Sequence, residues 1–348
     1  MKFEDANGVF NEMIKSLQIK NFRCFSDLKI EPLKRINLIT GQNNTGKTGI
    51  LEALVLLLGE SDPSHRNTNT RHHLANLFRT VGGDYNETFW NWMFNNKSFE
   101  KNVEIKATFD DSNNSNFGIQ IIKGGNQNQI RLNESGGIIQ PENFANNILY
   151  KIGNKRSAEL KPAVFSTLPS RPEQDAVDYQ RVILKRRKKQ VEKLLREIEP
   201  RLEAVEALRI GDQNQSPPAL IYADLGLSEM IPVTQLGQGF NRLLDIYSEI
   251  LVEDAKVLLI DEIENGLHYS VLPVIWKGLF LAAKEFDVQI FATTHSWECI
   301  LAADEAARSD KNYDLSLIRL DRVKDNIKAT VIDEKSLATA KELHWEMR

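Results

Sequence analysis

One stretch decides the fold, Gly41-Gln42-Asn43-Asn44-Thr45-Gly46-Lys47-Thr48. It fits the pattern G-x-x-x-x-G-K-[ST] of a phosphate-binding loop. The tight apolar run at 36–39 predicts a strand before it, and the apolar stretch 49–58 predicts a helix after it. Strand, glycine loop and helix in this order surround an anion with backbone N–H groups and a helix N-terminus. We therefore predict an α/β fold of the P-loop NTPase type.

The loop also predicts the ligand, which is ATP with Mg²⁺. Its glycines permit backbone angles that aim several N–H groups inward. Lys47 is expected to reach the β- and γ-phosphates as a catalytic contact, and Thr48 to offer its hydroxyl to Mg²⁺. The predicted nucleotide-binding residues of the loop are Gly41, Asn43, Asn44, Thr45, Gly46, Lys47 and Thr48. The alternative, an ordinary glycine turn, is disfavoured because the flanking strand and helix are both present.

A second apolar strand, at 256–260, ends in the two carboxylates Asp261 and Glu262. Burying carboxylates is costly unless a cation or hydrogen bonds compensate. We expect Asp261 to support Mg²⁺, and Glu262 to polarise a water for in-line attack on the γ-phosphate. The pair could instead only cap a strand, but its combination with the phosphate loop favours the catalytic interpretation.

At this point the sequence resembles the ABC-type ATPase heads of the SMC class. It is more similar to the OLD (overcoming lysogenization defect) family and its relatives in bacterial defence systems. The opening 17–25 looks like the first strand of these heads, and 263–268, ending in His268, looks like the OLD loop that follows the catalytic acids. Residues 236–242 look like the signature motif, and 293–296 look like the switch-histidine segment.

The resemblance implies a head-to-tail dimer. Gly237, Gln238 and Gly239 would contact the γ-phosphate held by a second subunit, and His295 would sense that phosphate as a catalytic residue. Gly237 stands where serine is usual, which removes one hydroxyl donor. Two alternatives remain open, since a Gly-x-Gly turn before a helix is common and a histidine at a strand end is often structural. No stretch is assigned to the glutamine loop of these heads.

We predict a single ATPase head over 1–348, divided into four parts. These are 1–62 with the N-terminal strands, phosphate loop and first helix; 81–165 as an antiparallel β lobe; 176–216 as a short helical insert; and 217–348 with the signature, the acids, the switch histidine, a hairpin and a final helix. The pattern at 176–209 predicts helix, with a break at Pro200. Only 53 residues follow His295, so we expect no TOPRIM nuclease module, and the insert is too short for a long coiled coil.

Composition limits the partners. Lys and Arg number 44 against 48 Asp and Glu, so no global positive charge indicates nucleic acid or a membrane. Two distant cysteines, Cys24 and Cys299, exclude a disulfide framework, and no apolar run is long enough for a membrane span. We expect a cytoplasmic protein without membrane contact. The basic run 185–189 could follow a DNA backbone, although a solvated helix face is favoured.

The expected function is that of an ATP-hydrolysing homodimer or higher homo-oligomer, assembled around ATP. By resemblance it would control a separate effector, a nuclease or toxin, in anti-phage defence. Two other interpretations remain. One is a nucleotide-gated scaffold with negligible turnover, for which Gly237 is the argument. The other is a DNA-repair head whose turnover DNA stimulates.

Overall fold

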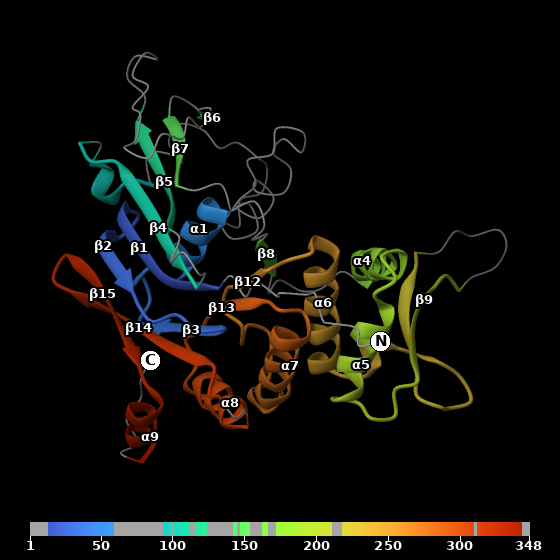
Figure 1. Ribbon diagram of the computed structural model, residues 1–348. Coiled ribbons are helices and arrows are strands. Elements are labelled where there is room, and N and C mark those ends of the chain that lie inside the picture. Colours follow the sequence, from blue (N-terminus) through green and yellow to red (C-terminus); the bar gives the residue numbers. More distant parts are fainter. Residues whose placement is uncertain are drawn as a thin grey trace, which may run out of the picture.

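The computed structural model describes residues 13–58, 93–98, 100–110, 116–123, 142–144, 147–153, 162–165, 172–210, 218–309 and 312–342. Within these ranges, two six-stranded sheets and one three-stranded sheet form the framework. The two large sheets face each other across helix α1 (Lys47–Leu58), and the remaining helices lie beyond the core sheet (Figure 1). Parts of the predicted ranges fall outside the description, among them 63–92 and the strand expected at 130–132.

The core sheet is mainly parallel and has the strand order β15-β14-β3-β13-β12-β8. Its strands are β3 (Ile36–Gly41), β8 (Pro162–Phe165), β12 (Val257–Ile260), β13 (Gln289–Thr293), β14 (Leu315–Val323) and β15 (Asn326–Ile332). Only β15, at one edge, runs antiparallel to its neighbour. Every residue of β3, β12 and β13 is buried, which explains their continuous apolar sequences, because both faces of the sheet are covered.

The two faces of the core sheet have different partners. On one face Leu38, Leu258 and Ile290 belong to the cluster of α6 (Gln238–Glu253), α7 (Leu272–Glu285) and α8 (Trp297–Arg308). On the other, Leu259 and Phe291 belong to the cluster of α1 and the antiparallel sheet. Helix α1 is therefore apolar on nearly all sides because it packs between two sheets (Figure 1).

The antiparallel sheet has the order β2-β1-β4-β5-β7-β6. Its strands are β1 (Ile14–Phe22), β2 (Phe25–Ile30), β4 (Val103–Phe109), β5 (Asn116–Lys123), β6 (Glu142–Phe144) and β7 (Asn147–Gly153). The boundaries differ from the expected 81–165 lobe at both ends. Strands β1 and β2 join this sheet because β1 pairs with β4, whereas β8 leaves it to pair in parallel with β12.

The helical insert is shorter than predicted. It consists of α4 (Pro172–Leu184) and α5 (Lys188–Arg196), after which 204–208 form strand β9 (Ala204–Leu208). The helix prediction to residue 209 is wrong because β9 pairs with β10 (Leu220–Asp224) and buries Val205, and β10 also pairs with β11 (Ile231–Pro232). Near the C-terminus the hairpin β14–β15 is followed by α9 (Glu334–Glu342). In the described part of the chain, no helix combines the length and apolarity that a membrane crossing needs.

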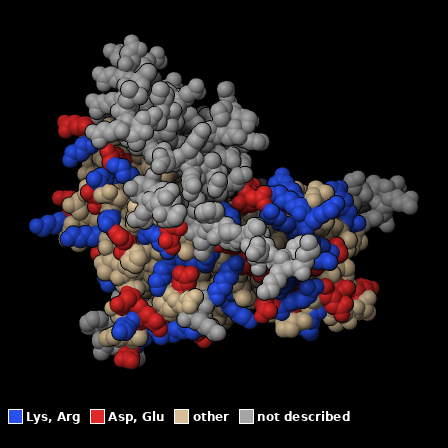
Figure 2. Space-filling view, viewed as in Figure 1, with Lys and Arg blue, Asp and Glu red and all other residues tan. Residues whose placement is uncertain are grey.

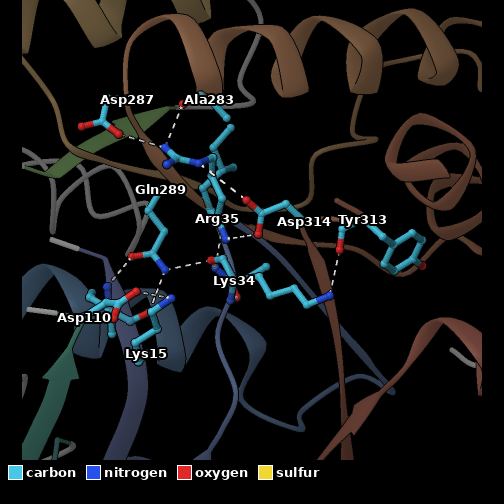
Figure 3. A network of polar contacts seen from close by, with 12 residues as sticks. Lys15, Lys34, Arg35, Asp110, Ala283, Asp287, Gln289, Tyr313 and Asp314 are labelled. Atoms are coloured by element: carbon cyan, nitrogen blue, oxygen red, sulfur yellow. Dashed lines mark hydrogen bonds and ion pairs between the residues drawn. The ribbon is translucent and has the colours of Figure 1, made fainter. Parts of the chain in front are cut away.

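A buried amide joins the two large sheets. Gln289 accepts a hydrogen bond from the backbone N–H of Ile14 at 2.9 Å, and its Nε2 donates to the carbonyls of Ile14 and Lys34 (Figure 3). Beside it, Arg35 forms ion pairs with Asp287 at 3.0 Å and Asp314 at 3.6 Å. These bonds lie at the amino ends of the core strands, so the opposite, carboxyl ends are left for a ligand site.

Candidate nucleotide-binding site

Three loops meet at the carboxyl ends of neighbouring parallel strands. Strand β13 lies between β3 and β12, with Thr293 paired to Ile39 and Ala292 paired to Ile260. The phosphate loop follows β3, Asp261 and Glu262 follow β12, and His295 follows β13. The topology therefore brings together segments about 220 and 30 residues apart in sequence, at the edge where α/β sheets bind ligands.

The loop conformation requires its two glycines. Gly41 has φ +145° and Gly46 has φ +90°, which are backbone conformations that favour glycine. A Cβ on Gly41 would lie 2.5 Å from the Leu320 carbonyl oxygen, and one on Gly46 would lie 2.4 Å from Cys24 Sγ. The loop is thus held between the end of β14 and the β1–β2 turn, with no room for a side chain at either glycine.

The charge at the loop comes from Lys47 and the start of α1. Lys47 Nζ donates to the carbonyls of Gly41 at 2.7 Å and Gln42 at 2.9 Å, so the ammonium lies within the loop. Burial lowers the pKa of Lys47, while the nearby Asp261, Glu262 and Glu264 raise it. The first turn of α1 adds its unpaired N–H groups, so the loop is suited to hold an anion.

Asp261 is held by two hydroxyl groups from different strands. Thr48 donates to Asp261 Oδ2 at 3.0 Å, and Thr293 donates to Asp261 Oδ1 at 2.6 Å. Thr293 in turn accepts the backbone N–H of Glu262 at 2.8 Å. The pair Thr48 and Asp261, predicted as metal ligands, is therefore in direct contact. A hydroxyl and a carboxylate oxygen at this spacing are oxygen donors of the kind Mg²⁺ prefers.

Glu262 and His295 face each other across the two strand ends. His295 Nε2 lies 3.9 Å from Glu262 Oε1, and both side chains are about one-third exposed, at 36% and 35%. Glu262 has φ +49°, a left-handed conformation that is uncommon outside glycine. Strain of this kind concentrates at functional sites, where neighbouring contacts hold it in place. The structure thus brings together the two residues predicted to act on the γ-phosphate.

Two residues of this cluster were not predicted as site residues. Thr293, which bridges Asp261 and Glu262, could have been suspected because a polar residue ends the apolar strand β13. Glu264 accepts the backbone N–H of His295 at 2.6 Å, and its other oxygen is buried without a hydrogen-bond partner. No sequence signal indicates that bond, because it joins two loops that follow different strands.

The predicted signature residues begin α6, on the opposite face of the core sheet from α1. Gly237 precedes the helix with φ +91°, and a Cβ there would meet nothing within 4 Å. Glycine at this position is thus explained by backbone conformation rather than by lack of space. A Cβ on Gly239 would lie 2.8 Å from Val271 Cγ1, and Gln238 is exposed. The described contacts of this segment do not include the phosphate loop of the same chain.

The basic run 185–189 is largely occupied by internal ion pairs. Lys185 and Arg187 both contact Asp254 at 2.6 Å, and Lys188 pairs with Glu206. Lys185 also donates to the Val252 carbonyl at 2.6 Å, near the C-terminus of α6. Acidic and basic side chains are interspersed over the face drawn in Figure 2. The run therefore fastens α4 and α5 to neighbouring elements.

Comparison with known proteins places the fold and the loops in a family. The family model of the AAA domain matches residues 16–229, more than half of the chain. An "ATP/GTP phosphatase" of Helicobacter pylori is 27% identical, and the match covers 85% of this chain and 89% of that protein. Shorter matches include an "OLD nuclease" of Thermus scotoductus, 43% identical over 20% of this chain and 13% of that protein.

Solved structures agree on the fold. An SMC head bound to the C-terminal winged-helix domain of ScpA has a TM-score of 0.55 and covers 93% of this chain and 99% of that one, at 12% identity. The SMC head domain from Thermotoga maritima gives a TM-score of 0.50 at 14% identity, covering 92% of this chain and 99% of that one. The chain belongs to the AAA domain family, and it is an ATPase head of the ABC/SMC type, in the OLD class.

Proposed function

We propose that the chain hydrolyses ATP with Mg²⁺ at the three-loop site. The observation that carries this is the contact between Thr48 and Asp261, 3.0 Å apart, beside Lys47. Lys47 and the amides of 41–48 hold the phosphates, and Thr48 and Asp261 hold the metal. Bound Mg²⁺ would neutralise phosphate charge. Glu262 accepts the proton of the attacking water, and His295, next to it, contacts the γ-phosphate.

The catalytic site is completed in a dimer. Gly237, Gln238 and Gly239 lie at a helix start, which offers backbone N–H groups to an anion, yet their described contacts do not reach the phosphate loop of the same chain. We therefore assign them to the γ-phosphate bound by a second copy. ATP binding thereby joins two copies head to tail, and hydrolysis releases them.

The work done by this cycle is control of a separate effector, a nuclease or toxin, in anti-phage defence. The support is the similarity to the OLD nuclease, of which the chain spans only 13%. The fold matches SMC heads, one of them bound to a partner protein, so a partner-binding role is compatible with this architecture. Purifying the tagged protein from phage-infected cells and identifying co-purified nucleases or toxins tests this part.

The central test is steady-state hydrolysis by wild type and Glu262→Gln. General-base removal is expected to lower the rate by about 10²- to 10⁴-fold while ATP binding persists. In sedimentation, ATP should stabilise the dimer of the variant, and Lys47→Ala should abolish both nucleotide binding and dimer formation. A wild-type rate no higher than that of Glu262→Gln would favour the nucleotide-gated scaffold instead.

A DNA-stimulated ATPase is the competing proposal from the Rad50 and RecF relatives. A DNA double-strand break repair Rad50 ATPase of Archaeoglobus fulgidus is 40% identical over 21% of this chain. Duplex DNA should then raise turnover in a salt-dependent manner. Because Lys185 and Arg187 are paired with Asp254, their removal tests that alternative poorly, and the rate with and without DNA is the informative measurement.

A further inference from the structure

The phosphate loop is contacted from outside by the C-terminal hairpin. Strand β14 runs parallel to β3 along its length, and Leu320 is paired with Gly41, where the loop begins. Two residues further on, Arg322 donates from Nη2 to the Asn44 carbonyl oxygen at 2.7 Å. Residues two apart on a strand share a face, so Leu320 and Arg322 contact the loop from the same side, one at its start and one near its middle.

The contact falls on an unusual part of the loop backbone. Asn44 has φ +62°, the left-handed region that asparagine tolerates better than most residues. Its carbonyl and the N–H of Thr45 belong to one planar trans peptide and point in opposite directions. A bond that holds the carbonyl toward β14 therefore aims the Thr45 N–H away from β14. The guanidinium is charged at every accessible pH, so the bond is charge-assisted.

The hairpin itself is fixed independently of the loop. Strand β15 packs beside β2, and Ser26 on β2 hydrogen-bonds to Asn326 at the start of β15. On the other side of the loop, Cys24 in the β1–β2 turn contacts Gly46. The loop is thus held between two hairpins that are themselves joined, and Arg322 is the charged member of this arrangement.

We propose that Arg322 is a positioning residue for the nucleotide. This rests on the proposed function, since it assigns the loop to ATP phosphates. By holding the Asn44 carbonyl, Arg322 keeps the loop amides in the orientation that binds phosphate and adds a positive charge beside them. Its effect is therefore on nucleotide affinity, with little effect on the chemical step or on folding, because its side chain is exposed.

The test compares four proteins: wild type, Arg322→Ala, Arg322→Lys, and Lys328→Ala as the matched control. Lys328 is an exposed cation on β15 of the same hairpin. The measurements are the dissociation constant of N-methylanthraniloyl-ATP with Mg²⁺, KM and kcat for ATP, and the melting temperature without nucleotide. Arg322→Ala should raise the dissociation constant and KM about fivefold, with kcat changed less than twofold and an unchanged melting temperature.

The lysine variant, which keeps the charge and one donor, should recover part of that affinity, and the control should behave as wild type. A dissociation constant of Arg322→Ala within twofold of wild type, or an equal weakening in Lys328→Ala, would overturn the assignment of Arg322. If wild type itself binds no adenine nucleotide, the proposed function fails instead, so the two failures are distinguishable.

Discussion

Thr293 Oγ1 lies 2.6 Å from Asp261 Oδ1 and donates a hydrogen bond to it. The same oxygen accepts the N–H of Glu262. One buried hydroxyl therefore fixes both the carboxylate proposed to hold Mg²⁺ and the backbone of the proposed general base. Because the threonine comes from β13 and the acids follow β12, the relative position of these two strands sets the geometry of the site.

Thr293→Val removes this hydroxyl while keeping the side-chain volume. Loss of an outer partner of a metal ligand typically weakens metal binding by 10- to 100-fold, so the Mg²⁺ concentration for half-maximal ATP hydrolysis should rise by about tenfold or more. The Glu262 N–H is left unpaired, which should lower the free energy of unfolding by about 1–3 kcal/mol. Thr293→Ser is the control. An unchanged Mg²⁺ dependence in the valine variant would contradict the role given to Thr293.

Glu52 predicts a pH dependence of stability. It lies one turn after Thr48 on α1, pairs with Arg23 at 2.9 Å, and is 7% exposed. Burial raises its pKa to about 7 despite the arginine, whereas the unfolded chain releases this proton near 4.5. Between these values the folded state binds more protons, so its stability falls as pH rises, by on the order of 3 kcal/mol in total.

Urea denaturation at pH 5 and pH 8 measures this effect. Glu52→Gln cannot ionise, so its free energy of unfolding should lose less than that of wild type between the two pH values. Glu104→Gln, at a carboxylate on strand β4 whose side chain is 29% exposed, serves as the control. Parallel pH profiles of wild type and Glu52→Gln would rule out the raised pKa.

Gly237→Ser restores the residue usual in signature motifs, yet we expect it to be harmful. The backbone has φ +91°, so any Cβ is strained although the space is open, and the free energy of unfolding should fall by about 1–2 kcal/mol. Gly237→Ala carries a similar strain without the hydroxyl, so comparing the two isolates the donor. If the serine variant is as stable as wild type and hydrolyses ATP faster, the conformational explanation for Gly237 is wrong.

Asp304 tests how α9 is attached. Its fully buried carboxylate accepts from Arg308 at 3.0 Å, Lys341 at 2.9 Å and Tyr313 at 2.8 Å. Asp304→Asn should destabilise the fold by about 3 kcal/mol, because it leaves two cations facing a neutral group. Asp321→Asn, which breaks an exposed pair with Arg319, should cost less than about 1 kcal/mol. Equal losses in both variants would contradict this ranking.

The same pair has a predictable acid sensitivity. Burial raises the pKa of Asp304, but hydrogen bonds from Lys341, Arg308 and Tyr313 outweigh this, and the net pKa lies below the ordinary 3.8. A carboxyl with a lowered folded pKa stabilises above the unfolded pKa and loses this contribution as pH falls through the folded value. The stability difference between wild type and Asp304→Asn should therefore be constant from pH 5 to 8 and shrink below about pH 4.

The phosphate loop and the acid pair could be predicted because each is a local pattern. An apolar strand, two glycines at fixed spacing and a helix start specify one backbone conformation within about twenty residues, and the structure has Gly41 and Gly46 in the required conformations. The pairing of strands could not be predicted in this way. Strands β1 and β8 are both apolar and were assigned by their neighbours in sequence, while their partners are β4 and β12.

The sequence alone therefore determined the fold class, the ATPase family and the order of the loops, because local spacing fixes backbone angles and hydrogen-bonding groups. Only the tertiary structure decided that Thr293 bridges the two acids, that Arg322 reaches Asn44 across 278 positions, and that the basic run faces Asp254. Each of these contacts joins segments that meet only after the two faces of the core sheet are buried, and that burial depends on the whole chain.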